Sequence, residues 1–348
     1  MRSKALSTVA VVLVITTTLA ENVFAQGALD RVRRRNGVDT GKIEGTSPLG
    51  VKIVKGGVEK QVPTEEIVSV YYASEPQELS AARTAADRGK HQESLKLLSE
   101  IDEKKIRREE IRAELAFLNV AAKSQLALSG RGKLTDAQST IKKFFAGNKS
   151  SFHTLEAIKL LGDLYLADED FASARKEYQR IAKAPSPYFK LRSELLVGKA
   201  WQAEGDDAQA AKAFQSVVDS SETGASLEPL KLAATLELAV SKAASGDASQ
   251  SVSTLQGIIN EADPENDGEL LGQAYNALGS AYLKAGDTQA ALFSFLHVDL
   301  LYSQSAEQHA QALYELKTLW QEMGRSDRAD EAAKELAERY PESRWASR

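Results

Sequence analysis

The chain has no cysteine, and that absence narrows the chemistry open to it. Among its 348 residues there are also only two methionines and four histidines. Without cysteine the protein cannot form disulfides, bind a metal through thiolates, use a cysteine nucleophile or carry a lipid on an N-terminal cysteine. Its stability outside a reducing compartment must therefore come from packing.

Long apolar runs and a strong charge of either sign are also scarce. The net charge is -5, so no overall positive field favours nucleic acid, and we expect no nucleic-acid partner. Hydrophobic residues make up 43% of the chain and charged residues 27%, which is typical of a globular protein rather than a disordered one. After the first 25 residues no stretch is apolar enough to cross a bilayer, so we expect a soluble mature protein.

The N-terminus has the three-part pattern of a signal peptide. Arg2 and Lys4 give a positive start, residues 9–15 are apolar, and Ala25 supplies a small residue before Gln26. The apolar run is much shorter than the ~20 residues that a membrane span needs. We therefore predict that residues 1–25 are cleaved after Ala25 and that the protein is exported to the periplasm or cell envelope.

Residues 26–74 have the character of a small strand-rich domain. Asn36-Gly37 and Gly56-Gly57 each predict a two-residue type I′ hairpin turn. Five runs rich in β-branched residues resemble a small SH3-like or Sm-like barrel, and so small a domain should dock on the helices that follow. The five runs are residues 32–35, 40–46, 51–55, 58–62 and 67–71.

A cluster of arginines opens this domain, namely Arg31, Arg33, Arg34 and Arg35. One interpretation is a contact with an anion such as a glycan or a lipid headgroup. The other is a solvated edge, where positive charge discourages association between sheets. RNA is not expected, because export is predicted and no set of stacking aromatics accompanies the cluster.

Residues 75–345 are rich in good helix formers, and apolar residues recur there at three- and four-residue steps. One pattern occurs three times. A glycine is followed after three residues by an aromatic residue, after nine more by an alanine, and after four more by a second aromatic residue. The three sets are Gly162, Tyr165, Ala174 and Tyr178; Gly198, Trp201, Ala210 and Phe214; and Gly279, Tyr282, Ala291 and Phe295.

This spacing predicts pairs of closely crossing helices. The glycine leaves room where the second helix crosses the first, and a larger side chain there would cost ~1–3 kcal/mol by overpacking. We expect the alanine to face the glycine and the second aromatic residue to pack against the following repeat. Gly205-Asp206 and Gly286-Asp287 predict the end of one helix and the start of the next.

The pattern resembles the tetratricopeptide repeat family, whose units are pairs of helices of ~34 residues. A weaker unit has Ala239 in place of the glycine and Lys242 in place of the first aromatic residue, and the last unit has Lys317 in place of the glycine. We count about seven pairs in residues 75–345. The resemblance implies a mainly α fold, a right-handed superhelix of helix pairs preceded by the small β-rich domain.

The resemblance also implies a function. In this family the exposed residues of each first helix line a concave surface that binds peptide segments or helices. The implied protein is a non-enzymatic scaffold of the exported bacterial envelope type, with self-association left open. An alternative is an envelope module that binds glycan or anionic lipid through the β domain. By register the concave-face residues are Lys159, Asp163, Arg192, Lys199, Gln202, Gln273, Asn276, Ser280 and Lys284.

The motifs that would indicate an enzyme are incomplete. The four histidines, His91, His153, His297 and His309, show no pair with the spacing of metal ligands. Residues 263–268 resemble the start of a calcium loop, but Ala274 stands where the last ligand is needed. We therefore expect no catalytic residues, no metal and no cofactor.

Overall fold

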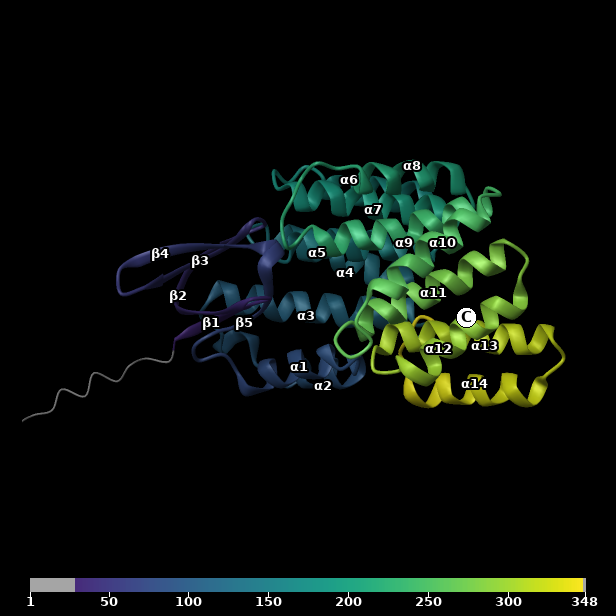
Figure 1. The fold of residues 1–348 in the computed structure, drawn as a ribbon. Helices are drawn as coiled ribbons and strands as arrows, with labels where there is room; N and C mark the ends of the chain where they lie inside the picture. Colours follow the sequence, from purple (N-terminus) through teal and green to yellow (C-terminus); the bar gives the residue numbers. More distant parts are fainter. Residues whose placement is uncertain (1–28, 347–348) are drawn as a thin grey trace, which may run out of the picture.

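The computed structural model describes residues 29–346, so the predicted signal peptide, residues 1–25, lies outside the described residues. Within that range the protein is mainly helical, with a small antiparallel sheet ahead of fourteen α-helices (Figure 1). None of these helices combines the length and the apolar character that crossing a bilayer requires.

The sheet contains five antiparallel strands in the order β4-β3-β2-β1-β5. Each strand overlaps one of the five predicted runs. In the described residues no ladder joins β4 to β5, so backbone pairing leaves the sheet open where a barrel was predicted. The strands are β1 (Asp30–Arg34), β2 (Gly37–Ser47), β3 (Gly50–Lys55), β4 (Val58–Pro63) and β5 (Ile67–Tyr71).

One of the two predicted hairpin turns is confirmed and the other is displaced by one residue. Gly56 and Gly57 have φ of +59° and +81° and connect β3 to β4 as a type I′ turn requires. Gly37 instead pairs with Arg34 inside the ladder, so the turn residues are Arg35 and Asn36. This register brings Arg34 to Asp39, where Nε donates to the carboxylate at 2.7 Å.

The helices pack in seven consecutive pairs, from α1·α2 to α13·α14. The first helices of the later pairs also contact one another: α7 packs on α9, α9 on α11, and α11 on α13. The helices are α1 (Gln77–Asp87), α2 (His91–Ser99), α3 (Glu109–Leu128), α4 (Leu134–Gly147), α5 (Thr154–Ala167), α6 (Phe171–Ile181), α7 (Pro187–Glu204), α8 (Asp207–Val218), α9 (Glu228–Ala244), α10 (Ala248–Glu261), α11 (Gly268–Lys284), α12 (Thr288–Leu301), α13 (Ala306–Glu322) and α14 (Ser326–Arg339).

The repeated glycines lie where two helices of a pair touch. A Cβ added at Gly162 would lie 2.3 Å from the ring of Tyr178, and one at Gly198 would lie 2.5 Å from the ring of Phe214. Gly279 has the same relation to Phe295, at 2.6 Å. We had expected the alanine to face the glycine, but the atoms nearest each glycine belong to the second aromatic ring.

We predict that Gly198→Ala lowers the free energy of unfolding by about 1–3 kcal/mol, because the new methyl group overpacks against Phe214. The loss should appear even though alanine favours a helix over glycine by ~1 kcal/mol. Gly257 in α10 is exposed and has nothing within 4 Å of an added Cβ, so Gly257→Ala should stabilise the protein and serves as the control. Urea unfolding followed by circular dichroism measures both, and equal shifts for the two variants would refute the packing role.

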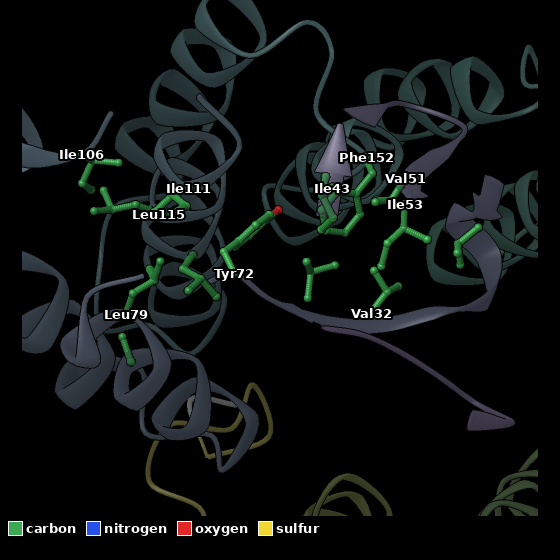
Figure 2. Close-up of a cluster of buried hydrophobic side chains, with 14 of the residues drawn as sticks. Val32, Ile43, Val51, Ile53, Tyr72, Leu79, Ile106, Ile111, Leu115 and Phe152 are labelled. Carbon is green, nitrogen blue, oxygen red and sulfur yellow. The ribbon is translucent and has the colours of Figure 1, made fainter. Parts of the chain in front are cut away.

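The sheet and the first helices share one hydrophobic core. Buried side chains of the strands, such as Val32 and Val51, belong to the same cluster as Leu79 of α1 and Leu115 of α3 (Figure 2). Tyr72 follows β5 and lies between the two groups in the picture. The expected docking of the small domain on the helical array is confirmed, and neither part encloses this core alone.

A buried aspartate also connects the sheet to the first helices. The side chain of Asp30 is 1% exposed and accepts two hydrogen bonds from the Arg108 guanidinium, at 2.8 and 3.0 Å. It also accepts the backbone N–H groups of Ile43, at 2.7 Å, and Ala73, at 2.6 Å. Because one carboxylate joins β1, β2 and the residues around α3, their relative positions are fixed.

A second buried carboxylate, Glu114 of α3, joins three helices. Glu114 is 3% exposed, accepts Arg83 Nε at 3.1 Å and contacts His153 Nε2 at 2.8 Å. The His153 ring stacks on Phe117 with 3.8 Å between ring centres. Burial raises the pKa of Glu114, but His153 and Arg83 outweigh it and hold the pKa below its usual 4.5.

We predict that Glu114→Gln lowers the free energy of unfolding by about 3 kcal/mol at neutral pH, because removing one partner leaves buried charge uncompensated. A depressed carboxyl pKa stabilises the folded state above its unfolded value, and that contribution is lost as the pH falls through the folded value. The difference between wild type and variant should therefore shrink below pH 4.5.

Urea titrations at neutral and acidic pH check this, with the exposed Glu109→Gln as the control. A difference that stays constant with pH would rule out the ionic role of Glu114.

Candidate functional site

The nine predicted concave-face residues lie on three first helices. Lys159 and Asp163 are on α5; Arg192, Lys199 and Gln202 are on α7; and the other four are on α11. Helix α9 lies between α7 and α11 and contacts both, and an ion pair between Arg192 and Glu156 joins α7 to α5. We call the surface of these four helices the inner face.

On α5 the two predicted residues bind each other. Lys159 Nζ lies 2.6 Å from Asp163 Oδ2, and the Tyr178 hydroxyl donates to Asp163 Oδ1 at 2.8 Å. Burial lowers the pKa of Lys159, but Asp163 and Glu156 outweigh it and the pKa is raised, so this lysine is a cation at neutral pH. Asp163 therefore joins the packing residue Tyr178 to the inner face.

On α7 the predicted cations pair with acids of the neighbouring first helices. Arg192 Nη2 lies 2.5 Å from Glu156 Oε2 of α5, and Lys199 Nζ lies 2.9 Å from Glu237 Oε1 of α9. Burial raises the pKa of Glu156, but Arg192 and Lys159 outweigh it and lower the pKa. The two residues of each pair lie about one repeat apart in the sequence. Each pair therefore links two successive units.

Sequence reasoning missed Glu156, Glu237 and the Ser241 hydroxyl, which accepts a hydrogen bond from Gln202 at 3.2 Å. A signal was present, because Arg192 and Glu156 are 36 residues apart, close to one repeat length. Opposite charges at that spacing fall side by side on successive first helices.

Helix α11 corrects one prediction. Asn276 is 2% exposed and donates through Nδ2 to the carbonyl of Gln308, at 3.0 Å, and to its side chain, at 3.1 Å. It is therefore buried between α11 and α13 and does not face solvent. The approach is close here, because a Cβ added at Gly272 would lie 3.3 Å from the Gln308 side chain.

The remaining α11 residues differ in their surroundings. The Ser280 hydroxyl donates to the carbonyl of Asn276 at 3.0 Å, one turn back in its own helix. Lys284 Nζ lies 3.4 Å from Asp207 Oδ2 at the start of α8, which links the sixth pair to the fourth. Gln273 is half-buried. The side chain of Lys284 is 47% exposed and that of Lys199 is 42% exposed, so accessible charge extends from α7 to α11.

The arginines of β1 are not equivalent. Arg34 is paired with Asp39 and with Glu66 at 3.2 Å, and the guanidinium of Arg31 lies 5.3 Å from the Tyr71 ring centre. Arg31, Arg33 and Arg35 are exposed. The predicted cluster is thus reduced to three accessible cations, two of which share one face of the strand.

One histidine has the surroundings of a metal ligand. His309 is fully buried, with Nε2 at 2.7 Å from Asp299 and Nδ1 at 2.7 Å from the Tyr340 hydroxyl. Glu335 is also near, with the candidate ligand atoms within 4.8 Å of one another. A proton on Nε2 satisfies Asp299, and the Tyr340 hydroxyl satisfies Nδ1. Every contact is therefore explained by packing of α12, α13 and the residue after α14.

No protein-family model matches the sequence, and no curated protein matches it. Among solved structures, a tetratricopeptide repeat protein from Parabacteroides merdae is 14% identical, with a TM-score of 0.47, and the match covers 76% of this chain and 92% of that one. A Rap protein complexed with Competence and Sporulation Factor is 13% identical, with a TM-score of 0.46 and coverage of 77% and 76%. NprR in complex with its cognate peptide NprX is 15% identical, with a TM-score of 0.42 and coverage of 77% and 79%. Because each TM-score is below 0.5, we base the proposals on contacts within this chain.

Proposed function

We propose that the protein is an exported, non-enzymatic scaffold of the tetratricopeptide-repeat type that holds a segment of a partner protein on its inner face. The observation that supports this most directly is the row of ion pairs that crosses from α5 to α7 and from α7 to α9. Export to the periplasm or cell envelope rests on residues 1–25, which lie outside the described part of the chain.

The row of pairs suits a peptide because each pair has an accessible half. The side chain of Glu156 is 39% exposed and that of Lys199 is 42% exposed. A carboxylate of the partner can replace an acid of the chain at little cost, since partly exposed ion pairs contribute only ~0–1 kcal/mol. The recognition expected is of a segment that carries both signs of charge.

We predict that inverting two pairs abolishes capture of the partner without unfolding the array. The variant exchanges Glu156 with Arg192 and Lys199 with Glu237, so each ion pair is kept while the charge pattern is reversed. Crosslinking of a tagged, exported form in cells of its own organism, followed by mass spectrometry, should lose the envelope protein that the wild type captures.

The thermal midpoint of the inverted variant should stay near that of the wild type, which excludes unfolding as the cause. A second control inverts the exposed pair Arg328 and Glu331 on α14 and should change nothing. If the inverted variant captures the same proteins as the wild type, the inner face is not the binding surface.

The alternative is an envelope module that binds glycan or anionic lipid through the β domain. It is favoured by one observation, the exposure of Arg31 and Arg33 on the face of β1 opposite the buried Asp30 and Val32. With Arg35 in the adjacent turn, three cations are available to phosphate or sulfate groups.

If the β domain acts in this way, reversing Arg31, Arg33 and Arg35 to glutamate abolishes sedimentation with anionic phospholipid vesicles or isolated envelope glycan. Reversal of three exposed lysines of the array, Lys149, Lys176 and Lys212, is the matched control and should leave it unchanged. Absence of binding by the wild type at physiological ionic strength, where exposed charges are screened beyond ~8 Å, eliminates the alternative.

A further inference from the structure

The first and last helix pairs of the array meet. Figure 1 shows α13 and α14 beside α1 and α2, and Glu342 bonds to His91 and Arg131, which lie 251 and 211 positions earlier in the sequence. The contacts are made by the stretch that follows α14, residues 340–345, which we call the C-terminal segment. It closes the helical array into a ring.

The start of the segment is anchored within the last unit. Helix α14 ends at Arg339, and the Tyr340 hydroxyl bonds to the buried His309 at 2.7 Å. The two rings meet edge to face at 5.4 Å between centres. Pro341 follows and, with no N–H and a fixed φ, sets the direction in which the segment leaves the helix.

Glu342 then binds the first two units. Its Oε2 accepts the backbone N–H of His91 at 2.7 Å, and its Oε1 lies 3.4 Å from Arg131 Nη1. His91 is the first residue of α2, and the N-cap residue Lys90 supplies no side-chain hydrogen bond to that helix end. Glu342 therefore caps α2 from the far end of the chain, where the partial positive charge of a helix N-terminus favours a carboxylate.

The segment next returns to α13. Arg344 Nη2 lies 2.6 Å from Glu307, and the Trp345 indole donates to the same carboxylate at 3.1 Å. The indole is 7% exposed and packs beside Tyr314, with 5.7 Å between ring centres. Two side chains of the segment are thus fixed by one glutamate and one tyrosine of α13.

The indole covers Tyr314, a residue of the first helix of the last unit. Tyr314 lies three residues before Lys317, which replaces the packing glycine, just as Lys159 lies three residues before Gly162. Tyr314 therefore occupies on α13 the position that Lys159 occupies on α5. The residue at this position is buried in other units, since Leu195 of α7 is 6% exposed and Asn276 of α11 is 2% exposed, so the C-terminal segment covers a position that a neighbouring unit covers elsewhere in the array.

We propose that the C-terminal segment is a built-in latch, which holds the ring closed through Glu342 and covers Tyr314 on the first helix of the last unit until it is released. The site that it fills takes a peptide with a carboxylate followed, three residues later, by an indole. The role of this latch in partner binding rests on the proposed scaffold function.

The first test measures the closure itself. Because the chain has no cysteine, nitroxide labels can be placed on two introduced cysteines, Lys96→Cys on α2 and Ala337→Cys on α14, both exposed positions. Electron-electron distance measurements should give one narrow distribution for the wild type and a longer, broader one for Glu342→Ala. The control, Glu338→Ala, removes an exposed glutamate one turn earlier and should leave the distribution narrow.

The second test supplies the segment in trans. A fluorescent peptide of residues 338–346 should bind the full-length variant Glu342→Ala/Trp345→Ala at least about tenfold more tightly than the wild type, whose own segment competes. The same peptide with both residues replaced by alanine should bind neither protein. Unchanged far-ultraviolet circular dichroism confirms that the variant is folded.

An unchanged distance distribution for Glu342→Ala overturns the latch, and so does equal affinity of the peptide for variant and wild type. Neither measurement uses the partner protein. The latch can therefore fail while capture on the inner face succeeds, and the scaffold function can fail while the ring still opens.

Discussion

The array depends on the contact between a glycine of one helix and an aromatic ring of the next. At Gly162, Gly198 and Gly279 the ring lies so close that no Cβ fits, and this fixes the separation within three of the pairs. The same rings pack onward, since Tyr178 shares a core cluster with Phe189 and Leu196 of the following unit. A contact within one pair thus also sets the spacing between pairs, and through it the alignment of charges on the inner face.

The local parts of this architecture could be predicted from the sequence, because their signals lie within one repeat. The Gly205-Asp206 turn is an example. Gly205 adopts φ of +89°, and the Asp206 carboxylate caps the next helix by accepting the Gln209 N–H at 3.0 Å. The displaced turn at Asn36-Gly37 shows the limit, because a ladder and an ion pair between Arg34 and Asp39 decided the register over the preference of two residues.

The candidate site was only partly predictable, for a physical reason. Register placed Lys159, Arg192 and Lys199 on the correct helices, but their partners belong to units about one repeat away and depend on how the units stack. Asn276 looked exposed because it is a polar residue, like Lys159 at the same register on α5, whereas α11 and α13 approach closely enough to bury it. The bond between Glu342 and His91, 251 residues apart, left no pattern in the sequence at all.

The carboxylate of Glu342 gives the molecule an order of assembly. A chain that folds as it emerges from its N-terminus can complete the core of strands and first helices once Phe152, the last residue of that core, has been added. The amino end of α2 must wait until nearly the whole chain is present, since its cap comes from residue 342. Contacts of such long sequence separation form late, because loop closure must precede them. The cap on α2 is therefore the last contact of the first pair of helices to form, although the core of that pair is complete long before.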